Sequence, residues 1–272
     1  MLTDAHCHPF FMIDNALAEG TGIRLPRDIA VAASGWELCQ HEMHEGMARA
    51  AAGPGSAPWV LCFGCHPQQP ASEGAASCRD TLDALARLAE EGRLSAVGEA
   101  GFDLYEERYR ATEEAQERVF ETQLDIACAR GLPMVLHLRR ALHKLFPYVH
   151  RLKNLPAVIF HSWPGSPDEA RAILRRGINA YFALGGAVCG TRKNSRASAA
   201  LLPADRLLFE TDAPYQPLPG KTCSSWDELP AIRDAVAALR REAGSPRGAP
   251  QELEAAVAEN FFRAYKKGLN RE

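Results

Sequence analysis

The sequence of 272 residues lacks three features that mark particular classes of protein. It has no uncharged apolar run of about 18 residues, the length a helix needs to cross a bilayer, so we expect no membrane association. The sequence has 31 Lys and Arg residues against 34 Asp and Glu, which gives a net charge of −3. This balance argues against a strongly basic tail that binds polyanions. The first residues carry no basic segment followed by a long apolar stretch, so we expect a cytoplasmic protein without a secretory signal.

The cysteines do not form the pattern of a disulfide scaffold or a zinc site. Eight Cys residues could form four disulfides in number, but a chain of this length buries enough core without them. Several lie inside apolar runs, among them Cys62, Cys128 and Cys189, so we expect reduced thiols. Cys62 and Cys65 have C-x-x-C spacing, but no second pair supplies the remaining zinc ligands, and we do not expect a metal or redox role for them.

Short apolar runs alternate with longer helical stretches along the whole chain. This alternation is typical of parallel strands that crossover helices bury on both faces. Eight runs in a chain of this length predict an α/β fold, a TIM (β/α)8 barrel that forms one domain over residues 1–272. The predicted strands are residues 2–6, 29–33, 59–64, 94–99, 133–137, 157–161, 179–184 and 207–211.

The intervening helices are marked by capping residues and glycine stops. Thr112 is expected to cap a helix that ends at Gly131, and similar patterns predict helices over residues 80–91 and 166–176. After a Pro-rich loop, one helix is expected to end near Gly244 and a last one to span about residues 251–267. His41, His44 and His150 fall in helical stretches, where we expect them on the surface.

Residue types that bind metal ions stand at the ends of five of the eight apolar runs. A single His at a strand end is usually a hydrogen-bonded structural residue, but five such occurrences favour a shared site. In a barrel the carboxyl ends of the strands converge on one face, where the active sites of this fold lie. The residues are His6 and His8 of the first run, Glu99, His137 and His161 of the fourth to sixth, and Asp212 just after the eighth.

The composition of this set predicts a centre of one or two divalent ions. His6 and His8 are two residues apart and therefore point to the same face of a strand. Four imidazoles and two carboxylates exceed the needs of one tetrahedral ion and suggest two ions bridged by a carboxylate. Ligands without thiolate suit Zn, Mn, Fe or Mg. We assign His6, His8 and Asp212 to one ion, His137 and His161 to the other, and Glu99 to the bridge.

Further residues on the same face are candidates for substrate contacts. His66 follows the third run, and from the residues alone a substrate or proton-transfer role is as good an interpretation as a structural one. Arg139 lies two residues after His137, and we expect it to contact phosphate. The same role is less favoured for Arg192. Tyr215 lies on a loop of this face and could stack on a base, although loop packing is the commoner role.

Six motifs in order resemble those of the TatD family, metal-dependent deoxyribonucleases of the amidohydrolase superfamily. The resemblance implies a TIM barrel with one or two divalent ions held by the same ligands, and it also implies that His66, Asp103 and Arg139 belong to the pocket. The motifs are TDAHCH at residues 3–8, FGCHP at 63–67, VGEAGFDL at 97–104, LPMVLHLRRA at 132–141, AVIFHSWPGS at 157–166 and FETDAPY at 209–215. Residues 258–265 (AENFFRAY) resemble the family's final helix.

Three departures from the family pattern concern the substrate rather than the metal. Pro9-Phe10 stand where the family often has an acidic residue, and Arg140 stands where it often has Asp. After Tyr215, residues 219–221 (PGK) replace the usual Arg-Gly, and residues 227–230 (DELP) replace Asn-Glu-Pro.

The combined pattern predicts a divalent-metal-dependent hydrolase that cleaves phosphodiester bonds in DNA or a small phosphodiester. The mild negative charge favours ends or single strands over a surface that grips a duplex. In this hypothesis Asp212 and Glu99 are catalytic: Asp212 takes a proton from the attacking water, and the departing oxygen takes one from water or from His66.

Two alternatives stay open at this point. The same centre would hydrolyse a small ester, lactone or amide equally well. A non-catalytic metal-binding barrel that serves as an interaction protein is less favoured, because the ligand set is intact. No obligate protein partner is evident.

Overall fold

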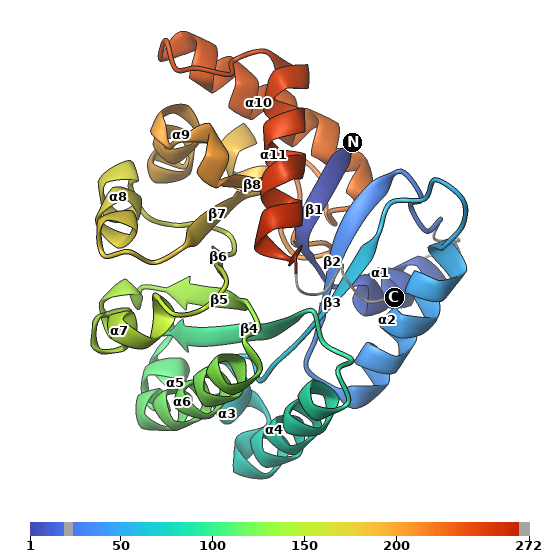
Figure 1. Cartoon of the computed structure of the whole chain (residues 1–272), viewed down its shortest axis with the longest axis vertical. Helices are drawn as coiled ribbons and strands as arrows, with labels where there is room; N and C mark the ends of the chain where they lie inside the picture. Colours follow the sequence, from blue (N-terminus) through green and yellow to red (C-terminus); the bar gives the residue numbers. More distant parts are fainter. Residues whose placement is uncertain (19–23, 267–272) are drawn as a thin grey trace.

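The computed structural model describes residues 1–18 and 24–266, and it shows eight parallel strands arranged around a common axis (Figure 1). The strands pair strictly in chain order, β1 with β2 through to β7 with β8. The predicted (β/α)8 barrel is therefore confirmed. The strands are β1 (Leu2–Cys7), β2 (Ile29–Gly35), β3 (Trp59–Phe63), β4 (Ala96–Asp103), β5 (Met134–Arg139), β6 (Val158–Phe160), β7 (Ala180–Leu184) and β8 (Leu207–Phe209).

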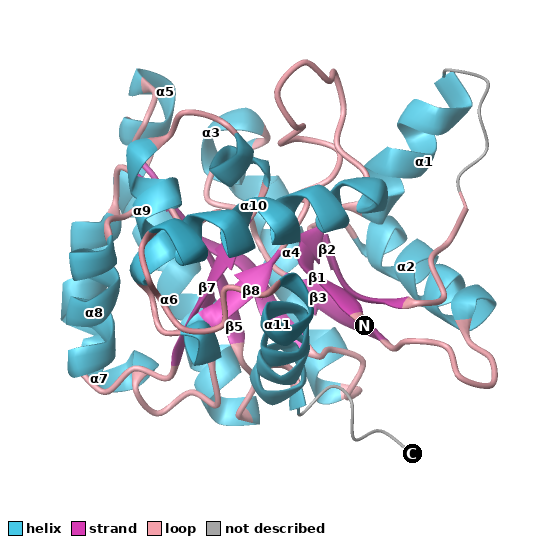
Figure 2. Cartoon of the chain, turned by 90° about the horizontal axis from the view of Figure 1, so that it is seen from above, coloured by secondary structure: helices cyan, strands magenta, loops and turns pink. Residues whose placement is uncertain are grey.

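Helices surround the strands on the outside, as Figure 2 shows from a second direction. Within the described ranges none of them is both long and apolar enough to cross a membrane. They are α1 (Pro9–Ala18), α2 (Leu38–Ala51), α3 (Gln69–Ser72), α4 (Gly74–Glu90), α5 (Glu107–Arg110), α6 (Glu113–Arg130), α7 (Val149–Leu152), α8 (Pro167–Arg175), α9 (Lys193–Leu201), α10 (Leu229–Glu242) and α11 (Pro250–Ala264).

Backbone hydrogen bonds join the segment that follows β8 to the end of β1 and so bring the first and last strands of the ring together. The N–H of Asp212 donates to the carbonyl of His6 at 2.9 Å, and the N–H of His8 donates to the carbonyl of Ala213 at 2.7 Å. The buried carboxylate of Asp4 accepts from both the N–H and the hydroxyl of Thr211, at 2.9 and 2.6 Å. These contacts hold the residues at the end of β1 beside those that follow β8.

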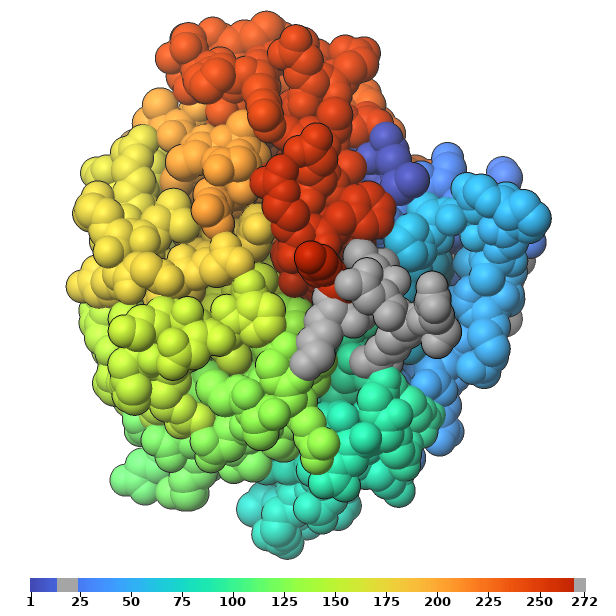
Figure 3. Space-filling model, viewed as in Figure 1, coloured from blue at the N-terminus to red at the C-terminus, as the bar shows by residue number. Residues whose placement is uncertain are grey.

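The barrel interior is filled by small and medium side chains from all eight strands, and α11 covers its amino-terminal end. Phe261, Ala264 and Tyr265 belong to the same buried cluster as Ala5 of β1. The Tyr265 hydroxyl donates to the Ala5 carbonyl at 2.8 Å, and Asn260 donates to the Leu207 carbonyl at the start of β8. Figure 3 shows α11 on the surface directly beside the first residues of the chain. The amino-terminal end is thus closed, which leaves the carboxyl end for a site.

Strand β4 is longer than the sequence indicated, because it continues past Glu99 to Asp103. The pairing with β5 shifts between Val97 and Ala100, a bulge of the kind that re-aims a side chain. Gly101 makes this close approach possible: it has φ +138°, and a Cβ there would lie 2.2 Å from the His137 carbonyl oxygen. Glu99 therefore projects from within a bulged strand rather than from a strand end.

The predicted helices are present, with three local corrections. Thr112 immediately precedes α6, but its hydroxyl donates to the Tyr109 carbonyl and does not cap the helix. The helix predicted over residues 80–91 begins earlier, at Gly74. His41 and His44 are fully buried, contrary to expectation, because α2 turns this face onto the barrel, whereas His150 is exposed as expected. The predicted end of the last helix at Lys267 lies outside the described residues.

Candidate metal centre at the carboxyl end of the barrel

Six side chains from five strands meet at the carboxyl end of the barrel. All of them are buried except His137, whose side chain is 15% exposed. The structure brings together all six residues that the sequence singled out as candidate ligands: His6, His8, Glu99, His137, His161 and Asp212.

Glu99 lies at the centre of the cluster, and its two oxygens face different groups of imidazoles. Its Oε2 lies 3.1 Å from His6 Nε2 and 3.5 Å from His8 Nε2. Its Oε1 lies 2.8 Å from both His137 Nδ1 and His161 Nε2. A carboxylate in this position has the geometry of a bridge between two cation sites.

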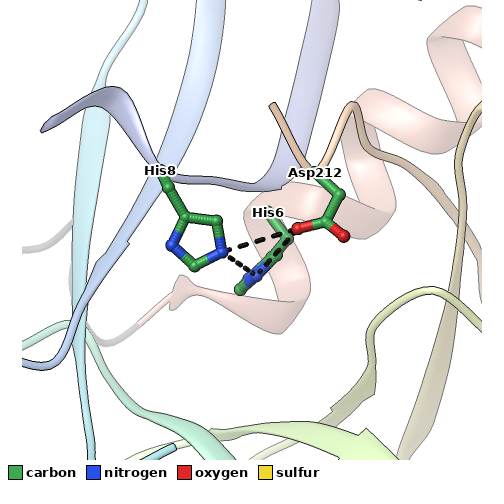
Figure 4. Close-up of side chains that lie close together, drawn as sticks. All are labelled: His6, His8 and Asp212. Carbon is green, nitrogen blue, oxygen red and sulfur yellow. Dashed lines mark hydrogen bonds and ion pairs between the residues drawn. The ribbon is translucent and has the colours of Figure 1, made fainter. Parts of the chain in front are cut away.

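His6, His8 and Asp212 form one corner of the cluster, with their polar atoms turned toward one another (Figure 4). The two Nε2 atoms are 3.2 Å apart, and Asp212 Oδ1 lies 3.6 Å from that of His6 and 3.5 Å from that of His8. Cys7, between the two His residues in sequence, points the other way, toward the Ala32 carbonyl at 3.7 Å. The alternation of β1 thus separates the thiol from the imidazoles.

Ser34, at the end of β2, orients both imidazoles of β1. Its hydroxyl lies 3.1 Å from His6 Nδ1, and its carbonyl accepts a hydrogen bond from His8 Nδ1 at 3.2 Å. Such contacts fix the ring and its tautomer. The sequence analysis missed Ser34, whose one signal is a hydroxyl in an otherwise apolar run.

The family resemblance implied that Asp103 belongs to the pocket, as a substrate contact would. Asp103 does not line the cavity, because its carboxylate is fully buried and both of its oxygens accept hydrogen bonds from protein groups. Oδ1 accepts from the N–H of Tyr105 at 2.9 Å, and Oδ2 accepts from the Gln68 amide at 2.7 Å. Oδ2 also lies 3.4 Å from His137 Nε2. Asp103 therefore holds the outer nitrogen of His137, which leaves Nδ1 facing Glu99.

The donor set fits a divalent cation. Since His8 Nδ1 is taken up by a hydrogen bond to a carbonyl, Nε2 is the ring nitrogen that can bind a cation, and it faces His6 Nε2 at 3.2 Å. Burial acts to lower the pKa of His8, but hydrogen bonds to Asp212 and Glu99 raise it to about 10. The carboxylates thus draw positive charge, as a proton or a metal ion, to this nitrogen.

His66 also reaches the cluster, but its ring is held in a different way. Its Nε2 lies 3.2 Å from Glu99 Oε1, close enough to form a third group of possible ligands with Glu99 and His137. Its Nδ1, however, accepts the backbone N–H of Gln68 at 3.2 Å, so the hydrogen of the neutral ring must sit on Nε2. His66 consequently presents an N–H donor to the site rather than a lone pair.

Gln216 fixes the second oxygen of Asp212. Its amide donates to Asp212 Oδ2 at 2.7 Å, while its oxygen accepts from the Ser162 hydroxyl at 3.0 Å. Asp212 has φ +51°, so its backbone turns sharply there and sends Oδ1 toward the imidazoles of β1. The sequence analysis missed Gln216, which lies in the loop where the chain departs from the family pattern.

A cavity of about 530 Å³ opens over the cluster and connects it to the surface. His66, Arg139 and Tyr215, which the sequence analysis singled out as candidates for substrate contacts, line it. Arg139 at the end of β5 and Arg192 directly before α9 bring positive charge to the cavity. Trp36, which the sequence analysis did not single out, lines the cavity from the end of β2. The cavity therefore joins a candidate metal centre, cations and aromatic rings in one space.

The chain is similar to known proteins along most of its length. The family model of TatD-related DNases matches residues 3–266. A protein of Escherichia fergusonii described as a 3'-5' ssDNA/RNA exonuclease TatD is 35% identical over 188 residues, which covers 66% of this chain and 69% of that protein. The Citrobacter rodentium protein of the same description is 35% identical over 214 residues, 74% of this chain and 75% of that one.

Solved structures show the same architecture. The crystal structure of a TatD homologue from Escherichia coli K12 aligns with a TM-score of 0.70 at 26% identity, covering 97% of this chain and 98% of that one. A TatD family hydrolase from Entamoeba histolytica aligns with a TM-score of 0.66 at 18% identity, over 93% of this chain and 87% of that one, which supports the fold alone.

Proposed function

The chain belongs to the family of TatD-related DNases and is a metal-dependent hydrolase of phosphodiester bonds, and on this premise we propose that it shortens single-stranded DNA or RNA from the 3' end. The observation that carries the proposal is the cluster of imidazoles around Glu99 at the floor of a cavity with two guanidinium groups on its wall. Residues 1–272 would act as one catalytic domain. A cavity of this size admits a strand end more readily than a duplex.

We assign the metal ligands as the sequence analysis does. His6, His8 and Asp212 would hold one ion, His137 and His161 the other, and Glu99 would bridge them through its two oxygens. Zn, Mn or Mg suits these donors. Divalent ions in these positions would polarise the phosphoryl oxygens and make water a stronger nucleophile at neutral pH.

The side chains of the cavity then divide the remaining tasks. Asp212 takes the proton of the water that attacks phosphorus, with Gln216 holding its other oxygen still. Arg139 neutralises charge that builds up on the phosphoryl group. His66 acts as a fixed hydrogen-bond donor and not as an acid, since loss of its only ring hydrogen would leave an anion. The departing 3' oxygen consequently takes its proton from solvent.

Labelled oligonucleotides test this proposal directly. With Mg, Mn or Zn, a single strand carrying a 5' label should give a ladder of products that shorten from the 3' end. A circular single strand of the same sequence should persist, because it has no end to enter the cavity. Cleavage of the circle would exclude the requirement for a strand end, and immediate release of the labelled 5' nucleotide would exclude the proposed polarity.

The same preparation should be assayed on neutral esters and lactones. The carbonyl alternative is not favoured, because the relatives are nucleases by description and the cavity wall carries cations that a neutral substrate does not use. A hydrolysis rate on a lactone that exceeds the rate on oligonucleotides would reverse this preference. The Asp212→Asn variant serves as the control for a contaminating nuclease.

A further inference from the structure

Three aromatic side chains form a continuous wall on one side of the cavity, next to the candidate ligand His8. Phe11 stacks against Trp36 with ring centroids 5.0 Å apart and planes 20° apart. Tyr215 lies 6.0 Å from Phe11 and 5.3 Å from His8, and Trp36 lies 5.9 Å from His8. Phe11 backs the wall, while Trp36 and Tyr215 line the cavity.

This wall is partly exposed, unlike an aromatic cluster in a core, and hydrogen bonds hold the backbone that carries Trp36. Tyr215 is 53% exposed, and Trp36 is partly exposed. The backbone N–H of Trp36 donates to the Gln40 side-chain oxygen at 3.0 Å, and its backbone carbonyl accepts from the Thr81 hydroxyl at 3.0 Å. Aromatic side chains have only two χ angles, so they bind a flat ring with a small loss of conformational freedom.

The arginine side chains and the aromatic wall reach the cavity from different strands. Trp36 follows β2 and Tyr215 follows β8, both neighbours of β1, whereas Arg139 ends β5 across the ring. Arg139, Arg140 and Arg192 are exposed. A strand end can thus place its last base against the rings while its upstream phosphates leave the cavity over the arginines.

We propose that Trp36 and Tyr215 form a stacking site for the terminal nucleobase of the substrate strand, beside the metal centre. This inference rests on the proposed exonuclease function and adds the group that it recognises. Stacking on aromatic rings tolerates every base, because each has a π face. The site therefore selects for the presence of a base and not for its identity.

Tryptophan fluorescence tests the site without turnover. The protein has four Trp residues, and Trp163 and Trp226 are buried while Trp59 packs against Trp226 at 5.9 Å. A nucleoside monophosphate such as dAMP should quench the fluorescence of the protein saturably, and deoxyribose 5-phosphate should not. The Trp36→Phe variant should lose this quenching. Quenching that survives in the variant, or that the sugar phosphate also produces, would overturn the proposal.

Kinetics on two matched oligonucleotides give a second test. Trp36→Leu should lower kcat/KM about 10-fold on a strand with a normal 3' terminal nucleotide, the effect of one lost stacking contact. The same variant should change kcat/KM less than about twofold when the terminal nucleotide lacks its base. Phe146→Ala removes a ring that is 52% exposed and does not line the cavity, so it should leave both values unchanged.

The outcomes separate this inference from the proposed function. Equal losses on the two strands would show a structural role for Trp36, and a loss that depends on the penultimate base would move the stacking site away from the terminal one. Either result overturns the inference and leaves the nuclease intact. If the wild-type protein cleaves neither strand, the nuclease function fails, and quenching by dAMP still decides whether the rings bind a base.

Discussion

The guanidinium carbon of Arg139 lies 3.7 Å from the centroid of the Tyr105 ring, a close cation–π contact at the rim of the cavity. Arg140 contacts the same ring at 4.7 Å, and the N–H of Tyr105 is fixed by Asp103. The same Asp103 holds His137. One carboxylate thus connects a candidate metal ligand to the tyrosine that positions a candidate phosphate contact.

The first prediction concerns Arg139 itself. Arg139→Ala should lower kcat/KM for phosphodiester cleavage by about 1.5 to 3 kcal/mol, the scale of one charged hydrogen bond. Hydrolysis of a neutral ester, where it can be measured, should change much less. Steady-state kinetics on both substrate types provide the comparison, and equal losses would mean that Arg139 supports the site without touching phosphate.

Tyr105 provides a second, milder prediction. Tyr105→Leu removes the ring under Arg139 but leaves the charge, so kcat/KM on oligonucleotides should fall by about 0.5 to 1 kcal/mol. In the Arg139→Ala background the same change should have almost no further effect, since the two residues act through one contact. A double-mutant cycle measures this coupling, and fully additive losses would contradict it.

Asp212 is expected to be both a ligand and the proton acceptor. Asp212→Asn keeps an oxygen that can face the imidazoles but removes the base, so turnover should fall by about 10²-fold or more. Most of the metal should remain bound, as elemental analysis of the purified variant would show. Activity near that of the wild type would remove Asp212 from the mechanism.

Ser34 is expected to act on metal affinity through His6. Ser34→Ala removes the hydroxyl next to His6 Nδ1 but keeps the carbonyl that fixes His8, so the dissociation constant for metal should rise about 10- to 100-fold. Ser95→Ala is a matched control, because Ser95 is equally buried and accepts a backbone hydrogen bond before β4. Competition with a chromogenic chelator measures both variants, and equal affinities would assign Ser34 no part in orienting His6.

The strand order and the cluster of candidate ligands could be predicted because each depends on local sequence. Apolar runs that end in His, Glu or Asp indicate where the strands lie, and they also indicate the face of the barrel on which these polar side chains converge. The roles of Asp103 and His66 could not be predicted, since each role depends on which atom of a distant element lies beside the side chain. Gln68 decides both cases, through its amide on Asp103 and its N–H on His66.

The residues that sequence analysis missed share a physical reason. Ser34, Trp36 and Gln216 have side chains that commonly serve packing or solvation, and only their positions in the barrel give them a role. Trp36 in particular follows β2, a strand whose end carries none of the candidate metal ligands. Its importance becomes apparent only once the cavity and the stacking with Phe11 are known.

Arg240, far from the cavity, carries a prediction about stability. Its side chain is 1% exposed and donates to the carbonyls of Ala199 and Leu202 at 3.1 and 2.8 Å. It also donates twice to the Pro246 carbonyl, at 3.0 and 2.8 Å. A single guanidinium therefore joins α10 to the end of α9 and to the loop that precedes α11.

Arg240→Met should lower the free energy of unfolding by about 2 to 4 kcal/mol, because it leaves buried carbonyls without donors. Arg171→Met is the control: Arg171 donates to the neighbouring Leu201 carbonyl, but its side chain is 40% exposed, and the loss should stay below about 1 kcal/mol. Urea denaturation measures both variants, and kcat/KM well below the transition should match that of the wild type. A neutral effect of Arg240→Met would mean that water or a local shift satisfies these carbonyls, and that the guanidinium is not what holds α9 and α10 together.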